Sequence, residues 1–245
     1  MTNTQRIIHY ASRTRGPFRR KDLHDYLTAY GGDIKEKSID VQIRRLLKAG
    51  WLQKKGWGEY ILTESRLPEF VYLPSQFEKG LHTELKLHFP FLDFCIWSPK
   101  VLSSLMLHVP DIGYTLIDVE KDGIESLFHT LQSMGLDNNI LLSPSMAECN
   151  RYLAGTDSIV VRQLIGRAPV TEIDGCNVPM IEKILIDCIG DNELLFARGS
   201  EIYNIFENAF ERYNINRLKL QAYASRRNRK DKLEQILKTT DHDKP

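Results

Sequence analysis

Basic side chains recur on one side of a predicted helix near the start of the chain. In the segment SIDVQIRRLLK, a rotation of about 100° per residue places Ile39, Ile43 and Leu46 on one face. The opposite face collects side chains without an acid: Lys37, Ser38, Val41, Arg44, Arg45 and Lys48. Arginine can bind a guanine edge or a phosphate, and serine can contact either. We interpret this face as a DNA-reading surface; a solvated basic helix face is the alternative.

Further basic residues lie on both sides of this helix. Arg19, Arg20 and Lys21 stand at the start of the preceding predicted helix, and Lys54 and Lys55 lie in the hairpin segment that follows. Residues that flank a recognition helix commonly hold the phosphate backbone. These five residues are therefore predicted phosphate contacts.

Three predicted helices position these side chains, and a hairpin follows them. The helices are expected at residues 4–13, from about Arg19 to a stop at Gly31-Gly32, and from residue 35 to a C-terminal cap at Gly50. WLQKKGWGEYILT predicts two strands about a turn at Lys55-Gly56. Trp57 of this hairpin fits either packing on the sugar backbone or packing in the core. This order is typical of a winged helix-turn-helix, predicted for residues 1–63.

Charge is unevenly distributed over the 245 residues, although the formal net charge is only +1. Residues 1–63 hold 13 Lys/Arg against 6 Asp/Glu, residues 64–213 hold 11 against 22, and residues 214–245 hold 9 against 4. Polyanion binding is therefore expected at the two ends of the chain. The tail segment ASRRNRKDK is interpreted as a second basic surface or, equally, as a solvated helix end: Arg226, Arg227, Arg229, Lys230 and Lys232.

After residue 63, predicted strands and helices alternate. The strands are expected at residues 70–73, 94–97, 114–119, 140–143, 159–164 and 170–173. The helices are expected at residues 76–89, 100–108, 123–134 and 146–153. This alternation favours an α/β arrangement with a mostly parallel sheet.

From residue 179 onward the pattern is helical. Helices are expected at residues 181–188, 200–213, 217–224 and 231–237, within a helical part of about residues 179–238. The predicted fold class is thus mixed α/β. An N-terminal winged helix-turn-helix precedes a larger α/β domain, residues 64–245, that ends in a helical subdomain.

One short segment could support catalysis. In LIDVEKDG, Asp118, Glu120 and Lys121 leave a predicted strand end, where acids and a lysine can hold a metal for phosphodiester cleavage. The spacing is loose, however, and a second acid would have to come from Asp93 or elsewhere. The chain lacks GxGxxG, GxxxxGK[ST], GxSxG and HExxH motifs. We therefore expect a protein that is not an enzyme, without catalytic residues, metal or cofactor, and keep a winged-helix-targeted nuclease as an alternative.

The composition indicates a cytoplasmic protein without a membrane partner. The sequence has no uncharged apolar stretch of about 18 residues, and its first residues lack a signal-peptide core. The four cysteines form no CxxC pair and are expected to be reduced core thiols.

Segments of the C-terminal third carry a family resemblance. They are the strand around Val161, the helix start VPMIEK from Val178, Asp187, and the run YASRR from Tyr223. In this order, after an N-terminal winged helix, they resemble AbiE-type antitoxins, the transcriptional-regulator partners of type IV toxin–antitoxin systems. Many relatives have Pro-Thr-Leu-Glu-Lys where this chain has Pro-Met-Ile-Glu-Lys, and residues 70–150 add little to the match.

The resemblance implies an autorepressor that also acts as an antitoxin. Its winged helix would bind operator DNA, with inverted repeats near its own promoter, and its C-terminal domain would counteract a nucleotidyltransferase-like toxin. In that family protection often needs no stable toxin complex, so direct binding is not assumed. The alternative is a ligand-sensing winged-helix repressor that uses the α/β half as an effector pocket. A neighbouring toxin-like gene would favour the first interpretation, and a ligand-dependent shift in DNA affinity would favour the second.

Overall fold

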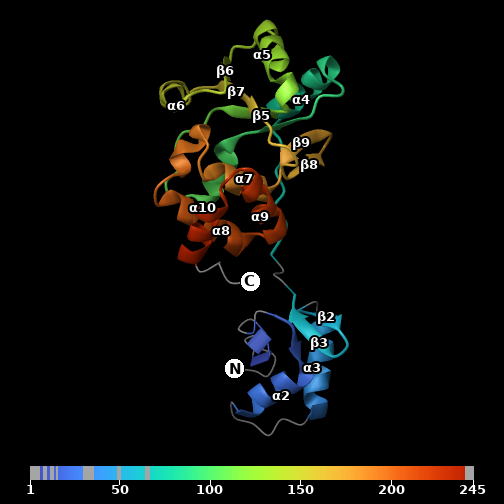
Figure 1. Ribbon diagram of the computed structural model, residues 1–245. Helices are drawn as coiled ribbons and strands as arrows, with labels where there is room; N and C mark the ends of the chain where they lie inside the picture. Colours follow the sequence, from blue (N-terminus) through green and yellow to red (C-terminus); the bar gives the residue numbers. More distant parts are fainter. Residues whose placement is uncertain are drawn as a thin grey trace. The chain divides into compact units, whose positions relative to one another are not determined.

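The computed structural model describes residues 6–7, 10–11, 14, 16–29, 36–48, 51–63 and 67–240 (Figure 1). Contacts divide the chain into a first unit that ends at Leu67 and a second unit that begins at Pro68. The sequence prediction placed this boundary between residues 63 and 64. Among the described helices, none combines the length and the apolar character needed to cross a membrane.

The first unit combines helices with a small antiparallel sheet. Its helices include α2 (Arg20–Ala29) and α3 (Glu36–Lys48), and helical residues also occur among those described before residue 15. The strands are β1 (Phe18–Arg19), β2 (Leu52–Gly56) and β3 (Glu59–Leu62), in the order β1-β3-β2. The hairpin agrees with the sequence prediction, whereas β1 was not predicted. Parts of the first predicted helix, and the predicted cap Gly50, lie outside the described residues.

Apolar spacing explains how α2 and α3 pack. Leu23 and Leu27 lie one turn apart on α2, and Ile39 and Ile43 do so on α3, so each helix buries one stripe. Leu46 extends the stripe of α3, and both helices meet apolar side chains from the strands and the preceding helical residues: Ile7, Ala11, Phe18 and Leu52. This core fixes which face of α3 remains outside.

The turn of the β2–β3 hairpin differs from the predicted one. Lys55 and Gly56 belong to β2, where a register shift between Lys54 and Gly56 marks an irregularity. The turn is formed by Trp57 and Gly58, and Gly58 has a φ of 73°, which a residue without a Cβ adopts at no steric cost. The predicted turn at Lys55-Gly56 was therefore wrong by two residues.

A four-stranded mixed sheet forms the centre of the second unit. Its strands are β4 (Phe94–Trp97), β5 (Thr115–Val119), β6 (Asn139–Leu142) and β7 (Ser158–Gln163), in the order β4-β5-β7-β6. β7 is parallel to both β5 and β6, and β4 is antiparallel to β5. The predicted mixed α/β class with a mostly parallel sheet is confirmed.

A separate two-stranded hairpin pairs β8 (Val170–Ile173) with β9 (Cys176–Pro179). The strand β8 was predicted from the sequence, whereas β9 was not. The strand predicted at residues 70–73 was also wrong, because this segment is assigned to no strand.

Alternating side chains divide the core of the second unit into two layers. On β5, Ile117 and Val119 point to the face covered by α4 (Gln76–His88) and α5 (Ile124–Ser133). Leu116, the residue before Ile117, points to the opposite face. The same alternation applies to β4 and β7, so the sheet lies between two helical layers.

The second layer is the helical part of the chain, where α7 (Ile181–Cys188) occupies the centre. All eight of its residues are buried. Helices surround α7 in Figure 1, namely α8 (Glu201–Arg212), α9 (Arg217–Arg226) and α10 (Lys230–Thr239). The shorter elements of the second unit are η1 (Pro99–Leu105), η2 (Lys121–Gly123), α6 (Met146–Tyr152) and η3 (Asn192–Ala197). The predicted helical subdomain is therefore present, with η3 as an unpredicted addition.

Candidate functional site

The outward face of α3 carries the residues predicted to read DNA. Among the described side chains of this helix, the exposed ones are Ser38, Val41, Arg44, Arg45 and Lys48. Each is basic or uncharged. The remaining predicted residue, Lys37, belongs to the helix, but its side chain lies outside the described ones. The face is therefore acid-free over the part of α3 that the structure describes.

Two of the predicted phosphate contacts on the α2 side are ion-paired in this structure. The Arg19 guanidinium donates to Glu59 Oε1 over 3.0 Å, and Arg20 Nε lies 3.1 Å from Asp40 Oδ1. Both arginine side chains remain well exposed, so the pairs are weak and exchangeable. Lys21 is exposed beside them.

The hairpin supplies two further cations and a large aromatic ring. Lys54 and Lys55 are exposed on β2. Trp57 at the turn is fully exposed (100%), so it does not belong to the core of the described first unit. This overturns core packing as the interpretation of Trp57.

A second candidate site is a buried cluster of charged side chains in the second unit, which we name the charge cluster. Its acids are Asp118, Asp187, Asp191 and Glu193. Its bases are Arg162, Lys183, Arg227 and Arg229. The formal charges of these eight side chains cancel.

The sheet contributes Asp118 and Arg162, which are register partners on the parallel strands β5 and β7. Arg162 Nε donates to Asp118 Oδ1 over 2.5 Å, and the Trp97 indole donates to Asp118 Oδ2 over 2.8 Å. Both charged side chains point to the face covered by α7, because each lies one residue away from an α4–α5-facing valine or isoleucine.

Helix α7 contributes Lys183 and Asp187, one turn apart. Lys183 Nζ lies 2.7 Å from Asp118 Oδ2 and 2.7 Å from Asp187 Oδ2, so it bridges the sheet and its own helix. Asp187 also accepts from Arg162 Nη2 over 3.0 Å and, through Oδ1, from the Tyr223 hydroxyl over 3.1 Å.

The segment after α9 closes the cluster. Arg227 donates to Asp187 Oδ1 over 2.9 Å and to Asp191 Oδ1 over 2.5 Å. Arg229 donates to the same Asp191 oxygen over 2.7 Å. Arg162 Nη1 binds Asp191 Oδ2 over 2.8 Å and Glu193 Oε2 over 3.2 Å, so the second unit's sheet and helices share one ionic network.

This arrangement corrects the predicted second basic surface. Arg227 and Arg229 turn inward onto Asp187 and Asp191 and cannot belong to a free basic patch. Arg226, Lys230 and Lys232 are exposed as predicted. The charge of a sequence segment does not specify the direction of each side chain, which is why this expectation failed for two of the five residues.

The cluster shifts the pKa values of its members in opposite directions. Burial alone would raise the pKa of Asp118, but the charges of Arg162 and Lys183 reverse this and hold it below its usual range. Burial alone would lower the pKa of Lys183, whereas Asp118 and Asp187 raise it above its usual range. Both side chains therefore remain ionised in the interior.

The residues proposed for a nuclease site, Asp118, Glu120 and Lys121, do not come together as a metal site. Asp118 is buried, and its two oxygens accept from Arg162, Lys183 and Trp97. The Glu120 carboxylate accepts from the backbone N–H of Asp93 over 3.1 Å, while Lys121 is exposed. The described residues contain no group of three or more His, Cys, Asp or Glu arranged to hold a metal ion.

Arg162, Asp191 and Glu193 were missed by the sequence analysis. A usable signal was present for Arg162, which interrupts the apolar strand SIVVRQ at a position that faces the interior. A buried arginine requires carboxylate or carbonyl partners, so it predicts acids nearby without identifying them.

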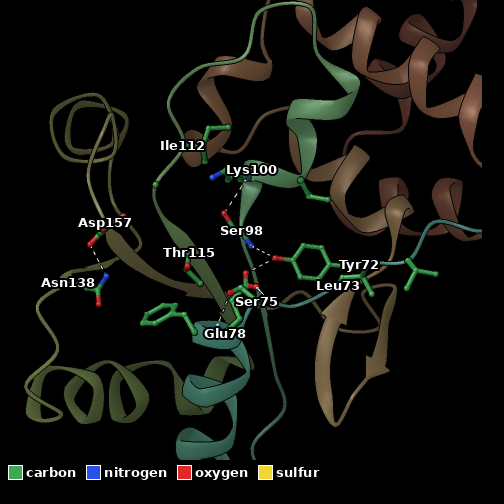
Figure 2. Close-up of a pocket in the computed structure, with 14 residues that line it drawn as sticks. Tyr72, Leu73, Ser75, Glu78, Ser98, Lys100, Ile112, Thr115, Asn138 and Asp157 are labelled. Atoms are coloured by element: carbon green, nitrogen blue, oxygen red, sulfur yellow. Dashed lines mark hydrogen bonds between the residues drawn. The ribbon is translucent and has the colours of Figure 1, made fainter.

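A cavity of about 670 Å³ lies elsewhere in the second unit (Figure 2). Its lining includes Tyr72, Phe77, Lys100, Thr115 and Asp157. None of them was predicted from the sequence as a site residue. They come from segments far apart in the chain, and no motif connects them.

The comparisons identify the family of the chain but not a characterised relative. A family model matches residues 38–243, so the chain belongs to the family described as a family of unknown function (DUF6577). The match begins within α3 and includes the hairpin, the charge cluster and the cavity. Comparison with the curated proteins gives no match.

Proposed function

We propose that this member of the DUF6577 family is a transcriptional regulator that binds duplex DNA through α3 and the β2–β3 hairpin. The observation that carries the proposal is the acid-free outward face of α3. Arg44, Arg45 and Lys48 are exposed on this face, away from the buried apolar stripe of the helix. Such a face meets a major groove without like-charge repulsion from the phosphates.

The arrangement of elements supports the same proposal. A helical segment, β1, α2, α3 and the β2–β3 hairpin follow one another, and the sheet order is β1-β3-β2. This is the element order of a winged helix, which we propose for the first unit. The hairpin would act as its wing, with Lys54 and Lys55 on phosphates.

The paired arginines fit a secondary role in DNA binding. Arg19 and Arg20 would exchange Glu59 and Asp40 for phosphate oxygens on binding. Exposed ion pairs contribute about 0–1 kcal/mol, so this exchange costs little. Arg44 and Arg45 would supply sequence selection, because bidentate guanidinium contacts distinguish guanine.

The experiment that tests DNA binding uses the full chain and fluorescence anisotropy. A labelled duplex from the region upstream of the coding sequence is compared with a scrambled duplex of the same composition. We expect tighter binding to the upstream duplex and a log–log salt dependence of about −0.9 per neutralised phosphate. Binding that does not respond to salt, or equal affinity for both duplexes, contradicts the proposal.

We propose further that this regulator is an autorepressor and the antitoxin of a nucleotidyltransferase-like toxin. The support is the resemblance to AbiE-type antitoxins. Lys183, Asp187, Tyr223 and Arg227 lie in the segments that carry it, and all four belong to or contact the charge cluster. The segments that carry the resemblance therefore contain residues of the charge cluster, which connects the helical layer to the sheet.

Co-expression tests the antitoxin role. The full chain and its Arg44→Ala/Arg45→Ala variant are each expressed from a foreign promoter with a toxin-like gene found next to the coding sequence. We expect both to relieve growth arrest, because the second unit carries the protective activity. If only the variant fails, protection depends on DNA binding; if both fail, the antitoxin role is refuted.

A ligand-sensing repressor is the second candidate, and the 670 Å³ cavity favours it. Its size lies within the range of about 300–1,000 Å³ that is typical of small-molecule sites. In contrast, the engagement of both Asp118 oxygens speaks against the nuclease alternative.

A further inference from the structure

The cavity in Figure 2 lies where the parallel strands of the second unit begin. Thr115 is the first residue of β5, Asn138 precedes β6, and Asp157 precedes β7. Figure 2 shows Asn138 and Asp157 on one side of the cavity and Ser75 and Glu78 on the other, with Thr115 between them. The cavity is thus assembled from one end of the sheet and the chain segment that leads into α4.

Apolar side chains form one part of the lining and are exposed to solvent. Val71 is 53% exposed, Leu73 is 76% exposed and Phe77 is 44% exposed. Exposed and buried side chains alternate along this extended segment: Val71 and Leu73 are exposed, whereas Tyr72 and Pro74 are buried. Exposed apolar side chains gathered around one cavity are typical of a binding site.

Hydrogen bonds hold this segment in place. The Tyr72 hydroxyl donates to Glu78 Oε1 over 2.5 Å and accepts from the backbone N–H of Ser98 over 2.7 Å. The other Glu78 oxygen accepts from the backbone N–H of Ser75 over 2.6 Å, within the capping box of α4. These hydrogen bonds fix the position of the segment on either side of Tyr72. Val71 and Leu73 therefore line the cavity in a defined position.

Two charges in the lining are uncompensated. The Lys100 ammonium and the Asp157 carboxylate have neither an ionic partner nor a side-chain hydrogen bond among the described residues. Each could therefore bind a ligand without first breaking an ion pair. Thr115, which is 7% exposed, adds a hydroxyl to the lining.

We propose that this cavity binds a small molecule with an apolar, preferably aromatic, body that carries one acidic group and one hydrogen-bond donor. The acidic group pairs with Lys100, and the donor faces Asp157. The body packs against Phe77, Val71 and Leu73. Such a ligand places apolar surface on apolar surface and leaves no charge of its own buried without a partner.

Two dyes that differ by one charge test the proposal on the full chain without DNA. Anilinonaphthalene sulfonate has an aromatic body, an N–H donor and an acidic group; N-phenylnaphthylamine is the same body without the sulfonate. We expect one saturable fluorescent site for each dye. Lys100→Gln should weaken the sulfonate dye about tenfold and leave the neutral dye unchanged, because it removes only the charge pair.

Phe77→Ser should weaken both dyes, because both use the aromatic body. The matched controls are Lys121→Gln, an exposed lysine outside the cavity, and Leu87→Ser, an exposed apolar residue on the same helix α4. Equal loss in the controls, or unchanged binding of both dyes to Lys100→Gln and Phe77→Ser, overturns the proposal. Since no DNA is present, this result is independent of whether the protein binds DNA.

Discussion

Lys183 and Asp187 lie one turn apart on α7, and their ion pair, 2.7 Å from Nζ to Oδ2, is almost completely removed from solvent. For an isolated ion pair at such a site, the free-energy cost of desolvation would cancel most of the electrostatic attraction. Here each partner has further charges: Asp118 next to Lys183, and Arg162 and Arg227 next to Asp187. The pair is stable because it belongs to a neutral network.

Removal of one member should therefore be costly. Asp187→Ala leaves Lys183, Arg162 and Arg227 with a missing partner in the interior, and we expect a loss of about 3–5 kcal/mol in the free energy of unfolding. Urea unfolding can be followed by Trp97, which contacts Asp118, in a background where the other two tryptophans are replaced by phenylalanine.

The control for this prediction is Lys79→Ala, which removes the exposed pair with Asp174 and leaves the positive-φ position of Asp174 unchanged. We expect a loss within about 1 kcal/mol, the usual range for a surface ion pair. If Asp187→Ala is no more destabilising than Lys79→Ala, the charge cluster does not stabilise the second unit.

Acid should weaken the second unit through Asp118 and Asp191. The pKa of each is lowered in the folded state, mainly because arginine and lysine charges overcome the effect of burial. A lowered folded pKa contributes stability that is present above the unfolded pKa, about 3.9, and is lost as the pH falls toward the folded pKa. We expect the Trp97 unfolding midpoint to be constant from pH 7 to about pH 5 and to fall below about pH 4. A midpoint that rises on acidification would contradict this assignment.

Substitutions in the first unit should separate base reading from phosphate binding. Arg44→Ala and Arg45→Ala are each expected to cost about 1–3 kcal/mol on the preferred duplex and to reduce the preference over a scrambled duplex. Lys55→Ala and Arg20→Ala should weaken both duplexes equally. Anisotropy titrations measure all four, with Lys121→Ala as an exposed control in the second unit. Equal, sequence-independent losses from all four would show that the recognition face is assigned wrongly.

Trp57 should report contact between the hairpin and DNA. Because its side chain is fully exposed, Trp57→Ala is expected to change the free energy of unfolding by less than about 0.5 kcal/mol. In a Trp51→Phe background, DNA should reduce acrylamide quenching of Trp57, while the buried Trp97 gives a constant signal. Unchanged quenching at saturating DNA would place the hairpin tip away from the duplex.

Local patterns were sufficient to predict most elements of the second unit. The bounds of β4, β8 and α7 match the predicted ranges to the residue, because buried strands and amphipathic helices leave periodic signals. The missed strand β9 also had a signal. Asp174 and Gly175 both have positive φ, and an Asp-Gly pair favours a tight hairpin turn of this kind.

The charge cluster could not be predicted in the same way. Arg162 is 44 residues from Asp118 and 25 residues from Asp187, and periodicity does not specify which distant polar residues meet. The cavity could not be predicted for the same reason, because Lys100 and Asp157 come together only through the folding of the sheet. The winged helix and the DNA-reading face stay predictions, supported by the exposure of Arg44 and Arg45.

The balance of the charge cluster also limits how relatives of this chain can diverge. Exchange of Asp118 alone removes one ionic partner from each of two cations, Arg162 and Lys183, and exchange of Arg162 alone removes one ionic partner from each of four carboxylates. A lineage that changes one partner passes through a poorly folded intermediate unless a second change follows. Asp118, Arg162, Lys183 and Asp187 should therefore be retained together or replaced together across the family, as one inherited unit.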